Sequence, residues 1–310
     1  MMYKKKWGDR SDGHKLNNVD TIYQLVPYIM KTRLDSQVFF EESLDYSKIE
    51  GMLHKLRREG HGNIRTMDVL IAATLRTMAQ RPRLNRFVCG SKIYARNSYT
   101  VSIAIKRDLS DNGEETTVKV DFDPTDSLFD VVEKMEKVLS DNKQVNSENN
   151  TDVFAGVVCR MPSFLLKTVV NFIMWLDRCG LLPKSIIKIS PFHSSFFITN
   201  IGSIGLKSVY HHLYEFGTTS LFLALGTKEK ELVLDDDKVP VEKRVMKLKV
   251  VIDERISDGF YNAVSMKVLK RILRAPETLL EKLPADKVVL DDGIQAKRKK
   301  REKGRTRVEN

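Results

Sequence analysis

One short segment contains most of the residues whose types and spacing suggest chemistry. It runs Asp253-Glu254-Arg255-Ile256-Ser257-Asp258-Gly259, between a stretch that alternates like a strand and a stretch with helical periodicity. A glutamate ordinarily titrates near about 4.3, and such a carboxylate accepts protons well at neutral pH only where burial raises that value. The plainer alternatives are a solvated or salt-bridged Glu254–Arg255 pair and an Asp258-Gly259 turn that only caps the next helix.

Three histidines precede this segment and are candidates for the same proton transfer. His193 lies just before Thr199 in the sequence, and His211 and His212 follow it. Because an imidazole titrates near neutral pH, His212 is an alternative general base. A buried, hydrogen-bonded histidine or a surface histidine is the more common role. Adjacent histidines without further ligands at suitable spacing do not form a metal centre, so we expect no metal.

Four further blocks, read together with the 253–259 segment, carry a resemblance to a known family. The blocks are Pro82-Arg83-Leu84-Asn85, Ser127-Leu128-Phe129, Phe197-Ile198-Thr199-Asn200-Ile201-Gly202 and Leu221–Gly226. Their order and spacing resemble the acyltransferase catalytic domain of 2-oxoacid dehydrogenase complexes and its relative chloramphenicol acetyltransferase, over roughly residues 21–283. The motif of that family is His-x-x-x-Asp-Gly, and its histidine falls on Glu254.

The resemblance implies roles for several residues. Glu254 takes the place of the general base, and Thr199 matches the hydroxyl that steadies the tetrahedral oxyanion. Asp258 matches an aspartate that forms a structural salt bridge with an arginine, for which Arg33 is a candidate. The remaining motif positions are Asn200, Arg255 and Gly259.

The resemblance also implies a coenzyme A thioester as co-substrate, a small-molecule or lipid-like acceptor, and a homotrimer whose active sites form between subunits. We expect no lipoyl group, because there is no room for a lipoyl domain before residue 21. The family's Gly-Leu-x-x-Pro strand is replaced by Gly113–Phe122, which has no proline. Two functions remain open: a coenzyme A-dependent acyltransferase, or a catalytically silent homologue that acts as an oligomeric binding or scaffold protein.

The charge of the chain is concentrated at one end. The 310 residues include 52 Lys and Arg and 41 Asp and Glu, for a net charge of +11. Residues 296–310 alone carry eight basic and two acidic residues. This basic tail can make weak electrostatic contact with a membrane surface or a nucleic acid. Three scattered cysteines and no secretory signal favour a cytoplasmic protein, free or peripheral to a membrane.

The periodicity predicts the elements that position these residues. We expect an N-terminal mobile arm (1–20), an acyltransferase-like domain (21–285) and a basic C-terminal tail (286–310). The fold class is α+β, a two-layer sandwich with a mixed sheet and helices on one face.

The helix at Pro162–Cys179 is an addition to the family pattern, and its apolar stretch is too short to span a bilayer. We expect this helix to belong to the core or to a subunit interface. The alternative is that it contacts a hydrophobic acceptor or a membrane surface. Predicted helices are 21–33, 48–59, 66–80, 128–139, 162–179 and 261–273, and predicted strands are 39–44, 92–94, 99–106, 116–122, 195–200, 220–226 and 245–252.

Overall fold

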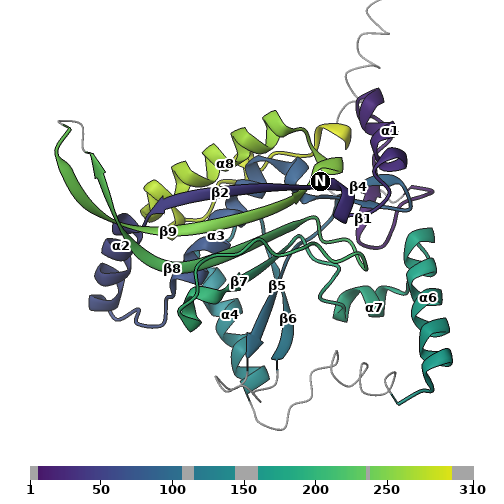
Figure 1. Ribbon diagram of the computed structural model, residues 1–310, viewed down its shortest axis with the longest axis horizontal. Coiled ribbons are helices and arrows are strands. Elements are labelled where there is room, and N and C mark those ends of the chain that lie inside the picture. The colour runs from purple at the N-terminus through teal and green to yellow at the C-terminus, as the bar shows by residue number, and fades with distance from the viewer. Residues whose placement is uncertain (1–5, 107–114, 144–159, 235–237, 295–310) are drawn as a thin grey trace, which may run out of the picture.

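A six-stranded mixed sheet forms the centre of the molecule (Figure 1). The computed structural model describes residues 6–106, 115–143, 160–234 and 238–294. In this sheet β7 runs parallel to β5 and β8, and the other neighbouring strands are antiparallel. The strands, in their order across the sheet, are β2 (Gln37–Asp45), β9 (Pro240–Asp253), β8 (Leu221–Leu234), β7 (Phe196–Asn200), β5 (Tyr99–Lys106) and β6 (Glu115–Phe122).

Helices cover one face of this sheet and enclose the main core (Figure 1). They are α2 (Tyr46–Arg58), α3 (Thr66–Gln80), α4 (Leu128–Lys143) and α8 (Gly259–Arg274). The central helix, α3, is buried along nearly its whole length, as its apolar sequence predicts. The predicted α+β two-layer sandwich is therefore confirmed.

The other elements lie mostly at one end of the molecule (Figure 1). A small sheet has the order β1-β4-β3, formed by β1 (Gly13–Lys15), β4 (Lys92–Arg96) and β3 (Arg86–Cys89). Three helices stand near it: α1 (Thr21–Ile29), α6 (Ser163–Cys179) and α7 (Lys184–Ile189). Short 3-10 helices are η1 (Leu34–Ser36), η2 (Pro82–Asn85), η3 (Ile201–Ile204), η4 (Glu254–Ile256), η5 (Pro276–Leu280) and η6 (Ala285–Lys287).

Most predicted elements are present, with boundary shifts that have local causes. The helix predicted at 66–80 has the predicted bounds, whereas the one predicted at 21–33 ends at Ile29. Strands β8 and β9 extend well beyond the predicted ranges, because their charged distal halves pair with each other in a long hairpin. Strand β3 and helix α7 were not predicted. The turn at 111–113, most of the loop at 141–152 and the basic run at 296–310 lie outside the described residues.

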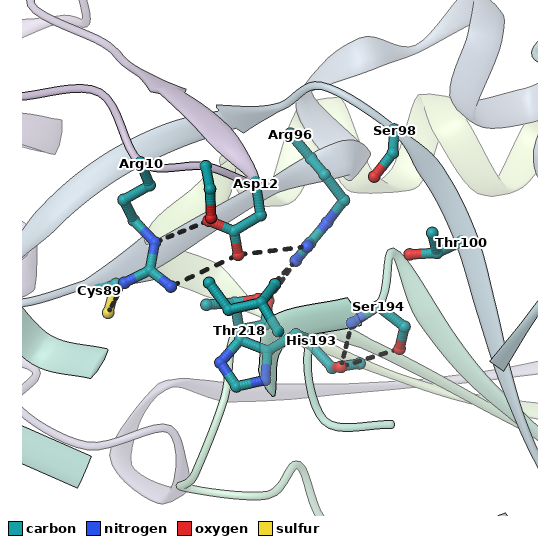
Figure 2. A network of polar contacts seen from close by, with 12 residues as sticks. Arg10, Asp12, Cys89, Arg96, Ser98, Thr100, His193, Ser194 and Thr218 are labelled. Atoms are coloured by element: carbon teal, nitrogen blue, oxygen red, sulfur yellow. Dashed lines mark hydrogen bonds and ion pairs between the residues drawn. The ribbon is translucent and has the colours of Figure 1, made fainter. Parts of the chain in front are cut away.

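The predicted mobile arm is wrong for residues 10–16. Arg10 is only 3% exposed, and its Nε donates a hydrogen bond of 2.8 Å to Asp12 Oδ1 (Figure 2). Its Nη2 donates a bond of 2.7 Å to Oδ1 of Asp177, at the end of α6. The arm was predicted from its polar composition, but the charge of Arg10 is satisfied by two buried carboxylates, one two residues away and one 167 residues away in the chain.

The predicted C-terminal boundary at residue 285 is also too early. Asp291 is buried, and both its carboxylate oxygens accept hydrogen bonds of 2.7 Å from Arg86. The folded part therefore continues to the end of the described residues. No helix among the residues described here is long and apolar enough to cross a membrane.

Candidate active site

The turn after β9 is held by a salt bridge between two residues of the motif segment. Arg255 Nε lies 2.8 Å from Asp253 Oδ1, and Arg255 Nη2 lies 2.7 Å from Asp253 Oδ2. Both side chains are buried, and Arg255 Nη1 also donates to the carbonyl of Met30 at 3.1 Å. The alternative of a Glu254–Arg255 pair is therefore wrong, because the arginine is fully engaged with Asp253.

Glu254 lies between these two residues and is left with a free carboxylate. It is partly buried, and no residue described in the structure forms a hydrogen bond or ion pair with it. The charge of Glu254 affects the nearby Tyr23. Burial raises the pKa of Tyr23, and the negative charges of Asp258 and Glu254 raise this pKa further. The fold thus fixes the backbone of Glu254 while its side chain stays available for a reaction partner.

Asp258 begins α8 and is the capping residue that the sequence predicts. Its Oδ1 accepts a hydrogen bond of 2.7 Å from the backbone N–H of Tyr261. The arginine beside it is Arg83, whose Nη1 lies 3.7 Å from Asp258 Oδ2. The predicted partner, Arg33, is wrong. Arg33 is buried away from Asp258 and donates to the carbonyls of Glu215 and Val88, at 2.9 and 3.0 Å.

Thr199 and Asn200 end strand β7 and line a large groove. The groove has a volume of roughly 1140 Å³, and the cationic side chains of Arg57, Arg65 and Lys228 are among its lining residues. The 3-10 turn that follows β7 lies tightly against β8. A Cβ atom at Gly202 would lie 2.3 Å from the carbonyl oxygen of Gly226, so only glycine fits there.

In a single chain, Thr199 and Glu254 are far apart along the strand direction of the sheet. Thr199 pairs with Ala224, and Ala224 pairs with Lys249. Glu254 lies five residues beyond Lys249, which corresponds to about 17 Å along the strand direction. Reacting atoms must come within about 3–3.5 Å of catalytic groups. One chain therefore does not bring the two predicted catalytic side chains to the same substrate.

Comparison with known proteins identifies the class of this fold. Residues 191–281, which include Thr199, Glu254 and Asp258, match the family model of the 2-oxoacid dehydrogenases acyltransferase (catalytic domain). The chain has the fold of the chloramphenicol acetyltransferase-like acyltransferases. The predicted resemblance is confirmed, and the acyltransferase catalytic domain is what this chain is similar to.

Solved structures with the acyltransferase fold cover most of the chain. A probable dihydrolipoamide acetyltransferase from Listeria monocytogenes has a TM-score of 0.54 at 14% identity, covering 85% of this chain and 95% of its own. A dihydrolipoamide acetyltransferase from Azotobacter vinelandii has a TM-score of 0.50 at 14% identity. The match covers 83% of this chain and 91% of the Azotobacter chain. A chloramphenicol acetyltransferase has a TM-score of 0.51 at 8% identity. The match covers 84% of this chain and 99% of the chloramphenicol acetyltransferase chain. No curated protein sequence matches the chain.

The histidines have different surroundings within the acyltransferase fold. His212 is exposed, and its ring contacts those of His211 and Tyr214, with centroids 4.7 and 5.1 Å apart. His193 is buried beside the Arg10–Asp12 pair (Figure 2). Burial lowers the pKa of His193, although a hydrogen bond of 3.2 Å to Asp177 opposes this effect. His193 is thus part of a buried structural network, and His212 stays a predicted alternative base.

Several residues of the site escaped prediction. The Asp253–Arg255 pair has a signal in the sequence, since Asp-x-Arg directly after a strand allows the arginine to fold back on the aspartate. Arg83 lies in a block that was recognised, but nothing local indicates that it meets Asp258. Gly259 is the first residue of α8, so the helix starts two residues before the predicted start at residue 261. Among the described residues, no group of three or more His, Cys, Asp or Glu side chains is arranged to hold a metal ion.

Proposed function

We propose that this protein is a coenzyme A-dependent acyltransferase, which moves an acyl group from a thioester to a small or lipid-like acceptor. It acts as a homotrimer in which Glu254 of one subunit faces Thr199 of the next. The observation that carries the proposal is the free carboxylate of Glu254 on a turn held by two hydrogen bonds between its neighbours. The acyltransferase fold and the groove at Thr199 support it.

In the proposed reaction, the thiol or hydroxyl of the acceptor attacks the thioester carbonyl carbon while its proton passes to the carboxylate of Glu254. The oxygen of the tetrahedral intermediate accepts a hydrogen bond from the hydroxyl of Thr199. Collapse of the intermediate breaks the carbon–sulfur bond. Coenzyme A leaves as a thiolate and recovers the proton from Glu254.

The groove at Thr199 suits the charged part of coenzyme A. Arg65 is partly neutralised by Asp68, at 3.1 Å, and Lys228 lies 4.1 Å over the ring of Tyr46. The side chain of Arg57 has no hydrogen bond or ion pair with any residue in the described ranges, although its carbonyl accepts a hydrogen bond from Gly60. These three lining side chains supply positive charge for the phosphates of the co-substrate.

The proposal is tested by acyl transfer from short and long acyl-coenzyme A to a panel of thiol and hydroxyl acceptors. Glu254→Gln removes the base and keeps the shape, so it should lower kcat by about a hundredfold or more. Glu277→Gln, on an exposed 3-10 turn, is the matched control and should leave the rate unchanged. No turnover together with no coenzyme A binding by the wild type would contradict the transferase and favour the silent homologue.

A mixing experiment tests whether two subunits share each site. Glu254→Gln and Thr199→Ala subunits should each be nearly inactive alone. Co-expressed, they should form mixed trimers in which about a quarter of the sites combine an intact Glu254 with an intact Thr199. Mixed preparations no more active than either parent would contradict the shared site.

A further inference from the structure

Helix α6 exposes apolar side chains that nothing in the described chain covers. Phe164, Phe172 and Trp175 are 76, 56 and 53% exposed. With Thr168 between them, these side chains recur every three or four residues and so form one stripe along the helix. The rings of Phe172 and Trp175 stack on each other, with centroids 5.9 Å apart. A contiguous exposed patch of large aromatic residues marks an interaction surface.

The polar contacts that anchor α6 to the rest of the described chain lie in its last turn, at Asp177. Asp177 is the only buried residue of the helix. Its carboxylate accepts hydrogen bonds from Arg10 at 2.7 Å and from His193 at 3.2 Å, and its carbonyl accepts one from Cys89 at 3.3 Å. Figure 1 shows the helix standing apart from the main sheet. One side of the helix, at Leu166, Val169 and Ile173, is partly buried, whereas the aromatic side is open. Because helices are stabilised mainly by burying apolar faces, the open aromatic side has the character of a docking face.

A second exposed apolar helix lies at the same end of the molecule (Figure 1). In α1, Ile22, Leu25, Tyr28 and Ile29 are 52 to 66% exposed, and only Pro27 is buried. The C-terminal ends of the two helices border one cleft of roughly 370 Å³, lined by Lys31, Met174 and other residues. The two helices therefore form one apolar end, here called the α1–α6 end.

The charges around α6 are mostly positive, whereas residues 20–35, around α1, carry two basic and two acidic residues. Residues 160–190 contain five basic residues and one acidic residue, and the acidic one is the buried Asp177. Lys167, Arg178, Lys184 and Lys188 are all exposed. A second copy of this end would bring like charges together. An anionic lipid surface would attract them, while exposed aromatic rings prefer the boundary between headgroups and acyl chains.

We infer that the α1–α6 end docks on an anionic lipid bilayer, with the aromatic stripe of α6 in the interfacial layer and the neighbouring cations on the headgroups. This inference does not depend on the proposed catalysis. It explains why a helix that is not long and apolar enough to cross a membrane exposes large aromatic side chains along one side.

Vesicle flotation of the full chain tests the inference. Binding to phosphatidylcholine–phosphatidylglycerol vesicles should exceed binding to phosphatidylcholine vesicles and weaken as salt is added. The double variant Phe172→Ser with Trp175→Ser should bind about tenfold more weakly or worse. So should Lys167→Gln with Lys184→Gln. Leu232→Ser is the matched control: it removes a side chain 76% exposed on β8, at the other end of the molecule, and should bind like the wild type.

Tryptophan fluorescence provides a second measurement. The chain has two tryptophans, so Trp7→Phe leaves Trp175 as the only emitter, and its emission should move to shorter wavelength on adding anionic vesicles. Binding unchanged by the α6 variants but lost on deleting residues 296–310 would overturn the inference in favour of the tail. Emission already at short wavelength without vesicles, with an oligomer that dissociates in the Trp175→Ser variant, would overturn it in favour of a subunit interface.

Discussion

Arg255 forms a two-point salt bridge with Asp253, two residues before it in the chain, with N–O distances of 2.8 and 2.7 Å. Neither side chain reaches solvent to any extent, at 4 and 0% exposure. Because Asp253 and Arg255 bind each other, neither forms an ion pair with Glu254, the residue between them. The salt bridge therefore leaves the carboxylate of Glu254 available for the role of general base that we propose for it.

Substituting Asp253 with Asn should lower the free energy of unfolding by roughly 3–5 kcal/mol, because it leaves the guanidinium of Arg255 buried without its counter-charge. Urea denaturation measures the change. Glu41→Gln is the matched control, since Glu41 pairs with Lys247 and Lys249 on the surface at 3.9 and 3.6 Å. Exposed pairs contribute about 1 kcal/mol at most. Equal small effects of both substitutions would show that the buried pair contributes little.

The helix cap, rather than the ion pair with Arg83, should account for the contribution of Asp258 to stability. The side chain of Asp258 is 41% exposed and lies 3.7 Å from Arg83, whereas its bond to the Tyr261 N–H is 2.7 Å. Asp258→Ala should therefore lower the free energy of unfolding by about 0.5–2 kcal/mol, and Asp258→Ser should recover most of it. Arg83→Gln removes the ion pair with Asp258 together with a closer one to Asp292, so its effect sets an upper limit on what the Asp258 pair contributes. If Asp258→Ser lowered the free energy of unfolding as much as Asp258→Ala does, the effect would come from the charge of Asp258 and not from the helix cap.

Asp177 should make stability depend on pH in the acid range. Burial opposes its ionisation, but hydrogen bonds from His193 and the charge of Arg10 outweigh burial and lower its pKa from 3.8 to about 2. A carboxylate with a depressed pKa in the folded state stabilises the protein fully above its unfolded pKa. That contribution disappears as the pH falls through the folded value. The pKa difference corresponds to about 2 kcal/mol.

The Asp177→Asn variant isolates this effect. Its deficit in unfolding free energy relative to the wild type should be constant near neutral pH and should shrink by about 2 kcal/mol between about pH 4 and pH 2. Urea midpoints across that range measure the deficit. Asp286→Asn, at an exposed position, should show no deficit at any pH. A deficit for Asp177→Asn that stays the same down to pH 2 would mean that the contribution of Asp177 does not come from its charge.

Local patterns in the sequence were sufficient for most elements and for the motif segment. The apolar periodicity of residues 66–80 predicts a buried helix, because side chains three and four apart share one face whatever the rest of the chain does. The order of the short blocks likewise identified the acyltransferase fold. Asp258 as a helix cap also needed only its neighbours, since a cap bonds to an N–H three residues away.

Only the tertiary structure decided which distant charges meet. Arg10 enters the core because Asp177 lies beside it, 167 residues later in the chain, and Arg83 rather than Arg33 reaches Asp258. The separation of Thr199 from Glu254 follows from strand order and register, which are properties of the whole sheet. Such pairings depend on which groups are desolvated together. No window of local sequence contains that information, because burial is set by the packing of the complete chain.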